Sequence, residues 1–211
     1  MKRIAFALVG ALLAAGAVPA YAASTLEVPT SAVAPSVDPH ADDTSFNNAA
    51  VAQIDWNSAK SQNGNEDTTA RLTTDGKYLY VRFDAVQTER IVSAQPVDGK
   101  SSGDLVWVEL QPGGANATSY RFAASPDGSS SATASSGAAP AFDASGATYD
   151  GGYTVTMKIP LAELANARAG GTWNAQFGRA IAGSGAQLVW SHDGTVAQAG
   201  TLTMPAAVGK S

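Results

Sequence analysis

The chain has 211 residues with 13 basic and 18 acidic side chains, a formal net charge of −5, and no cysteine. This acidic balance argues against a nucleic-acid partner and against an anionic membrane surface, because both require basic patches. Without cysteine, the chain has no disulfide framework, no thiolate metal site and no lipid-bearing cysteine.

Residues 1–22 have the three parts of an export signal. Lys2 and Arg3 precede a run of small and aliphatic residues, and Ala20-Tyr21-Ala22 fits the small-x-small rule for cleavage. The apolar run is too short to span a bilayer comfortably. We therefore expect cleavage after Ala22 and a periplasmic or secreted mature chain with no transmembrane segment.

The segment 23–37 is small, polar and proline-bearing, which predicts a tether or a leading strand. Residues 38–211 are expected to form one domain, beginning with a loop-rich entry. From Thr68 onward, short apolar alternations are separated by turn signals such as Asp75-Gly76 and Asp150-Gly151. The strands predicted from them cover 68–74, 77–85, 104–111, 119–125, 130–136, 147–149, 153–160, 173–182, 186–192 and 200–205.

Short strands at regular spacing predict an all-β fold, an antiparallel two-sheet β-sandwich of the immunoglobulin-like kind. One short helix is expected at 161–167, between Pro160 and Gly170-Gly171.

Period-two alternation assigns each strand side chain to one of two faces. The positions predicted to form the core are Leu79, Val81, Phe83, Val106, Val108, Leu110, Tyr120, Phe122, Tyr153, Val155, Met157, Ile159, Trp173, Ala175 and Phe177. On 104–111 the opposite face carries Trp107 and Glu109. A hairpin between this strand and 119–125 places Glu109 beside Arg121, and Trp107 beside Ala123.

If these strands share one sheet, its second face is a candidate ligand-binding surface. It would carry Tyr80, Arg82, Trp107, Glu109, Arg121, Lys158, Asn174 and Gln176, and all of these except Lys158 are the candidate ligand-binding residues. A flat aromatic ring stacks on the apolar face of a sugar, while amides and charged groups bind its hydroxyls. This mixture suits a saccharide or glycan. The alternative interpretation is a solvated sheet face with one ion pair and one amphipathic tryptophan.

The order of motifs resembles a known family. The motifs are D-W-x-x-A from Asp55, D-x-x-x-L-Y-V from Asp75, D-x-V-x-V from Asp104, Y-R-F from Tyr120, G-G-Y-T-V with K-I-P-L over 151–161, W-N-x-Q-F from Trp173, Arg179, and Trp190-Ser191. Together they are similar to the family 9 carbohydrate-binding-module-like domain, a relative of the DOMON sandwiches, over about residues 40–204.

The resemblance implies a two-sheet sandwich that is non-catalytic, often associated with glycoside hydrolases, and able to hold structural calcium. Family members clamp a sugar between two tryptophans. Here the corresponding places, near Ser101 and within 195–198, have no tryptophan, and Trp107 replaces the family glutamate inside D-x-V-x-V. Arg121, Asn174 and Gln176 match polar positions on the family's binding sheet, and Trp107 is the candidate substitute platform.

Other chemistry has weaker support in the sequence. We expect no catalytic residues, because no acid–base constellation is visible around the only histidines, His40 and His192, or the acids Asp104 and Glu109. The loop acids Asp38, Asp42 and Asp43, with Asn47, are oxygen ligands of the kind calcium prefers, but their spacing fits no EF-hand, so we assign no metal site. Some DOMON sandwiches bind haem b through methionine with histidine or lysine, and Met157, His192 and Lys158 are the candidates; we expect no haem, since Met157 is a core position.

The sequence thus predicts an exported carbohydrate-binding module. One alternative is an envelope protein-interaction module without sugar binding, which a large apolar patch around Trp107 would favour. A further alternative is a haem-b-binding electron-transfer domain.

Overall fold

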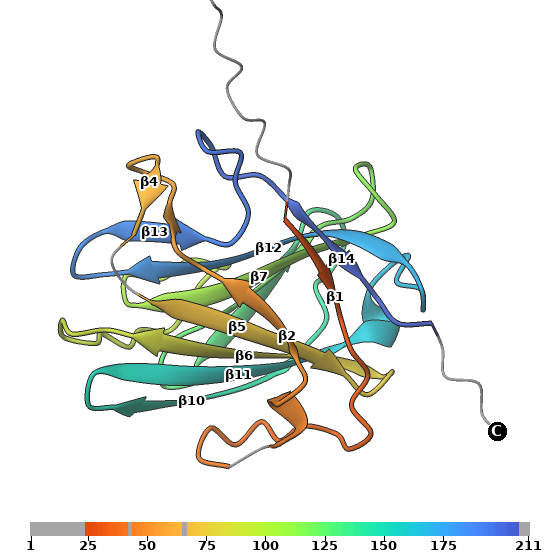
Figure 1. Cartoon of the computed structure of the whole chain (residues 1–211), viewed down its shortest axis with the longest axis horizontal. Coiled ribbons are helices and arrows are strands. Elements are labelled where there is room, and N and C mark those ends of the chain that lie inside the picture. Colours follow the sequence, from red (N-terminus) through yellow and green to blue (C-terminus); the bar gives the residue numbers. More distant parts are fainter. Residues whose placement is uncertain (1–23, 42–43, 65–66, 207–211) are drawn as a thin grey trace, which may run out of the picture.

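A computed structural model describes residues 24–41, 44–64 and 67–206, and it contains two packed β-sheets (Figure 1). The signal segment 1–22, Asp42 and Asp43 lie outside the described residues.

The larger sheet, sheet A, has the strand order β4-β3-β13-β12-β7-β8-β9, and β14 pairs with both β12 and β1. Its strands are β1 (Thr25–Glu27), β3 (Trp56–Asn57), β4 (Gln62–Asn63), β7 (Leu105–Pro112), β8 (Tyr120–Ala124), β9 (Ser130–Ala134), β12 (Thr172–Ile181), β13 (Ala186–Val189) and β14 (Gly200–Thr203). The β1–β14 pair is parallel, and the other printed pairs of this sheet are antiparallel.

Sheet B has the order β10-β11-β6-β5-β2 and is antiparallel throughout. Its strands are β2 (Ala50–Gln53), β5 (Thr68–Thr74), β6 (Tyr78–Val86), β10 (Asp143–Tyr149) and β11 (Gly152–Pro160). The two-sheet sandwich predicted from the sequence is therefore confirmed. In Figure 1, β5, β6, β11 and β10 lie below β13, β12 and β7.

The core lies between the two sheets and has the composition that alternation predicts. All fifteen predicted core positions are buried; Val81, Val108 and Phe177, for example, have no exposed surface. The turns also agree with the sequence, because Gly76 and Gly151 take positive φ (85° each), a conformation in which glycine carries no steric cost.

Two details differ from the prediction. The expected helix at 161–167 is only the 3₁₀ turn η2 (Leu161–Glu163), and a second 3₁₀ turn, η1 (Thr44–Phe46), is present. The short η2 is expected physically, since seven residues are too few to stabilise an α-helix and Asn166 enters the left-handed region (φ 64°). The leading segment supplies β1, which extends sheet A at β14.

Candidate functional site on the outer face of sheet A

The assumption that all predicted site residues share one sheet is wrong. Tyr80 and Arg82 lie on β6 of sheet B, whereas Trp107, Glu109, Arg121, Asn174 and Gln176 lie on β7, β8 and β12 of sheet A. These two sets face outward on opposite sides of the sandwich. Alternation fixes the face of a residue within its own sheet, but it does not say to which sheet a strand belongs.

Tyr80 and Arg82 have local partners on sheet B. The Tyr80 hydroxyl donates to Asp75 Oδ2 at 3.1 Å, and burial, followed by this contact with Asp75, raises the pKa of Tyr80 above its ordinary value of 10.0. Arg82 Nε donates to Asp84 Oδ1, and Arg71 Nη1 donates to Asp84 Oδ2. Both residues therefore stabilise the outer surface of sheet B.

On sheet A, one cross-strand row explains the tryptophan in β7. In this row Trp56 pairs with Val189, Val189 with Gly178, Gly178 with Trp107, and Trp107 with Ala123. Because glycine has no side chain, the indole of Trp107 lies over the backbone of Gly178, where a Cβ atom would overlap its six-membered ring. The row forms a small apolar cluster on the outer face, which we call the outer aromatic cluster: Trp56, Leu105, Trp107, Ala123 and Val189.

Trp107 is consequently covered, and the prediction that it is an exposed platform is wrong. Only 7% of its surface is accessible, and the guanidinium of Arg121 lies over the indole ring, 4.1 Å from its centroid. A sugar ring cannot reach a face that a cation already occupies. Trp107 is a packing residue under the site in this conformation.

The predicted pair of Glu109 and Arg121 is confirmed. They are direct cross-strand partners, and Arg121 Nη1 donates to Glu109 Oε1 at 2.6 Å. Arg121 Nε also donates to the carbonyl of Gly99 at 2.9 Å. The Glu109 side chain is 45% exposed and that of Arg121 is 26% exposed, so the carboxylate is the more accessible group of this pair.

The two amides differ in their availability. Gln176 is 6% exposed; its Nε2 donates to the carbonyls of Ser191 and Gln198, and its Oε1 accepts from the Ser191 amide. Gln176 therefore anchors the 191–198 loop and has little capacity for a ligand. Asn174 is half-buried, and its Nδ2 donates to Gln111 Oε1 at 3.1 Å.

Two loops border this face where the resemblance places the tryptophan walls. On one side, residues 92–103 approach Arg121 through Gly99 and cross β8 and β9 through bonds such as Gly99 N to Ser131 Oγ. On the other, the 191–198 loop is closed by Asp193, which accepts from the Thr195 hydroxyl and from the amides of Thr195 and Val196. The walls carry exposed valines, Val97 (66% exposed) and Val196 (57%), instead of tryptophans.

A stacked aromatic pair that the sequence did not suggest stands beside the 191–198 loop. The rings of Trp56 and His192 are 4.0 Å apart and inclined by only 7°. His192 is half-buried, and its Nδ1 accepts from the Gly194 amide. The pair depends on the β3–β13 contact between distant parts of the chain, so no local pattern could have revealed it.

The candidates for haem and metal binding are separated or only partly described. Met157 lies in the core, Lys158 lies on the outer face of sheet B over Tyr78, and His192 stacks on Trp56, so the three side chains do not converge. Within the described ranges, no group of three or more acidic or histidine side chains is placed to hold a metal ion. Asp38 Oδ1 accepts the amide of His40, as a loop cap does.

Asp104 and Glu109, the carboxylates considered for catalysis, lie in different surroundings. Asp104 has no exposed surface, and it accepts from Gln87, from the Val92 amide and from the Ala182 amide. Glu109 is instead paired with Arg121 on the surface.

Among the described residues, no helix has the length and hydropathy that a membrane span requires.

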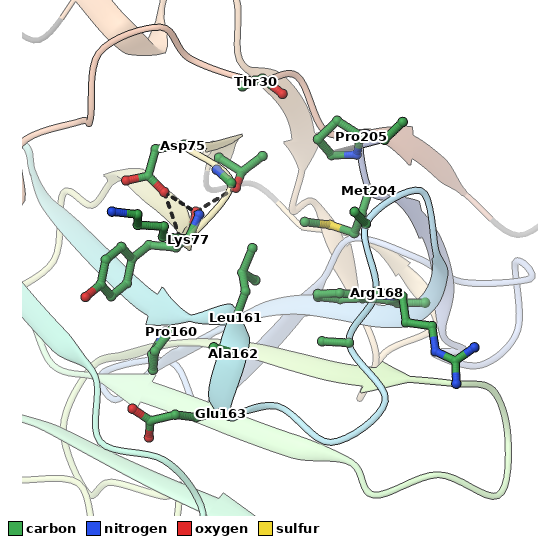
Figure 2. Close-up of a pocket in the computed structure, with 17 residues that line it drawn as sticks. Thr30, Asp75, Lys77, Pro160, Leu161, Ala162, Glu163, Arg168, Met204 and Pro205 are labelled. Carbon is green, nitrogen blue, oxygen red and sulfur yellow. Dashed lines mark hydrogen bonds between the residues drawn. The ribbon is translucent and has the colours of Figure 1, made fainter. Parts of the chain in front are cut away.

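A well-formed hollow lies away from this face. It has a volume of about 690 Å³ and lies at one end of the sandwich, between the β5–β6 turn, η2 and the end of β14 (Figure 2). The candidate site on the outer face of sheet A is formed by the side chains described above, and none of them lines this hollow.

The fold is a β-sandwich of the kind found in family 9 carbohydrate-binding modules. No family model matches the sequence, and no curated protein sequence matches it. Several solved structures are similar to the chain in fold, including the following three. One is a proposed carbohydrate-binding protein from Bacteroides uniformis, with a TM-score of 0.67 and 14% identity over 87% of this chain and 100% of the other.

The other two are structures of a family 9 carbohydrate-binding module from Caldicellulosiruptor kristjanssonii. The complex with cellotriose has a TM-score of 0.65 and 15% identity over 89% of this chain and 97% of the other. The complex with glucose has a TM-score of 0.65 and 16% identity over 89% and 99%. The likeness thus confirms the family 9 fold predicted from the order of the motifs.

Proposed function

We propose that this protein is an exported, non-catalytic carbohydrate-binding module. The observation that carries the proposal is the fold: it is similar over nearly the whole chain to modules solved with glucose and cellotriose. The surface chemistry supports it, since the outer face of sheet A combines a charged pair, an amide and a flat ring pair, which are the groups that bind sugar hydroxyls and ring faces.

The proposed binding surface is centred on Glu109 and Arg121, with Asn174 on the neighbouring β12. The Glu109 carboxylate accepts hydrogen bonds from sugar hydroxyls, and Arg121 donates hydrogen bonds to hydroxyl oxygens while its guanidinium stays fixed over Trp107. The half-buried ring of His192, stacked on the buried Trp56, offers a flat surface at the border of this site, in place of the absent wall tryptophans. Because the two bordering loops carry exposed valines and no tryptophan, this surface favours a saccharide that lies along the sheet rather than a sugar clamped between two rings.

A glycan array followed by calorimetric titration of the identified sugar tests the proposal. Glu109→Gln keeps the shape of the side chain and removes its charge, so we expect a loss of about 1.5–3 kcal/mol, the usual contribution of a hydrogen bond to a charged group. The matched control is Arg82→Gln, which changes a comparable ion pair on the opposite sheet and should leave affinity unchanged. Failure of the array to detect any glycan, or equal losses in the two variants, would refute this site.

Export is tested separately. N-terminal sequencing of the protein from the envelope or secreted fraction should give Ala23 as the first residue, because cleavage is expected after Ala22. A folded protein that retains Met1 would contradict it. A large exposed apolar patch around Trp107 would have favoured the envelope-interaction alternative, and the covered indole gives that alternative no support.

A further inference from the structure

Two adjoining hollows at the end of the sandwich share Arg168 and Trp173 as lining residues. The larger, shown in Figure 2, has an apolar lining that includes Pro160, Leu161 and Met204. The smaller, of about 450 Å³, has a lining rich in polar groups: Asn116, Asn166, Arg168 and Thr172, with Trp173. The pair therefore offers an apolar compartment beside a polar one.

The charges divide unequally between the two compartments. Lys77 and Glu163 line the larger hollow together with Asp75, whose carboxylate already accepts the amides of Lys77 and Tyr78. Figure 2 shows Arg168 on the side of this hollow away from Asp75 and Lys77. Arg168 is the one charged residue that lines the smaller hollow, and it forms no ion pair with any residue in the described ranges. The smaller hollow is accordingly positive.

Trp173 adds a buried donor at the same place. The residue is 2% exposed, and its Nε1 has no hydrogen-bond partner among the residues that the structure describes. A Cβ atom added to Gly171 would lie 3.1 Å from this nitrogen, and Gly171 lines the smaller hollow but not the larger. Buried N–H groups in native proteins are almost always paired, so an acceptor is expected there.

We propose that this end of the sandwich binds a small organic carboxylate with an apolar body. The carboxylate lies in the smaller hollow, where it accepts from Arg168 and from Trp173 Nε1, and the amides of Asn116 and Asn166 border it. The apolar body extends along the other side of Trp173 into the larger hollow, whose volume is within the usual range for small-molecule sites. A neutral sugar would leave the guanidinium without its counter-charge.

Calorimetric titration of the full chain with a graded series tests this site. The probes are acetate, hexanoate and 3-phenylpropionate, with 3-phenylpropanamide as the neutral match of the last. We expect one equivalent of 3-phenylpropionate to bind, and at least tenfold weaker binding of both acetate and the amide. Absence of saturable binding for all three carboxylates, or equal affinity for the acid and its amide, would overturn the proposal.

Two variants test the assigned donors. Arg168→Gln changes an exposed side chain and should weaken 3-phenylpropionate at least tenfold without changing the melting temperature. Trp173→Phe keeps an aromatic ring and removes the N–H, and it should also weaken the acid more than the amide. Unchanged acid affinity in Arg168→Gln would overturn the proposal even if Trp173→Phe does not fold. Glu109→Gln should not affect this titration, which separates the result from that of the sugar site.

Discussion

The contact between Trp107 and Gly178 gives the sharpest test of how the outer face of sheet A is built. Trp107 is 93% shielded: Gly178 lies beneath its indole, Arg121 lies over it, and Trp56 and Val189 stand in the same cluster. Truncation of a buried tryptophan to alanine typically costs about 3–5 kcal/mol. About 0.5–1 kcal/mol of that loss is expected from the cation–π contact with Arg121. We therefore expect Trp107→Ala to lower the free energy of unfolding by about 3–5 kcal/mol.

The effect of Gly178→Ala on stability should have opposite signs in the natural protein and in the Trp107→Ala protein. In the natural protein, Gly178→Ala places a methyl group inside the space of the Trp107 ring, and overpacking of this kind costs about 1–3 kcal/mol. In the Trp107→Ala protein the ring is gone. There Gly178→Ala should stabilise by about 0.5–1 kcal/mol, since glycine in a strand interior is that much less stable than alanine.

Urea denaturation of the four proteins, followed by far-UV circular dichroism, measures this cycle. Val196→Ala, at a position 57% exposed, is the control and should change stability by no more than about 0.5 kcal/mol. A loss below about 1 kcal/mol for Trp107→Ala would mean that the indole is not packed as described. An equal cost of Gly178→Ala in both backgrounds would show that the two residues do not touch.

Three further predictions concern single side chains. Gln176→Glu puts a buried carboxylate against the carbonyls of Ser191 and Gln198, so the free energy of unfolding should fall by about 2–4 kcal/mol. Amide hydrogen exchange should become faster in the 191–198 loop, and unchanged exchange would contradict the anchoring role of Gln176. Burial raises the pKa of Tyr80, so the folded state resists its ionisation, and the free energy of unfolding should decline as pH rises above about 10. In urea denaturation from pH 8 to 11, Tyr80→Phe should make that decline less steep. Hydrogen bonds from the Thr195 side chain and the Val196 amide lower the pKa of Asp193 to about 2, so the ionised carboxylate stabilises the folded protein at pH values above the unfolded pKa of 3.8. The difference in unfolding free energy between the natural protein and Asp193→Asn should vanish as pH falls to about 2. A difference that persists there would contradict this assignment.

The period-two alternation of apolar residues and the turn signals were sufficient to predict the strands and the core residues. Alternation placed residues such as Phe83 and Met157 in the core, and the β7–β8 register followed from the short connection between the two strands. The pairing of Glu109 with Arg121 was predictable for this reason: it depends on a hairpin and on period two, both of which are local.

The composition of the outer face was not predictable in the same way. Tyr80 and Trp107 occupy equivalent outward positions, but long-range pairing places their strands in different sheets. The burial of Trp107 also depends on Gly178, 71 positions away, which is its cross-strand neighbour only because β7 pairs with β12. A single sequence carries no signal for that contact, so a tryptophan that packs and one that binds a ligand give the same pattern.

The motif residues from which the fold can be predicted differ from the residues proposed to bind a sugar. Arg179, without exposed surface, donates to Thr68 of β5, to the Val86 carbonyl and to Gln87, and thus joins sheet A to sheet B. Gln87 in turn donates to Asp104, which accepts the Val92 amide at the start of the loop bordering the candidate site. Asp104 and Arg179 belong to the motifs by which the chain resembles family 9, and both are structural. These motif residues stabilise the sandwich, whereas this chain keeps the fold with no tryptophan in either loop where the resemblance places one. We therefore expect the preference of the proposed sugar site to depend on the two bordering loops and on Glu109 and Arg121, and not on the residues that hold the sheets together.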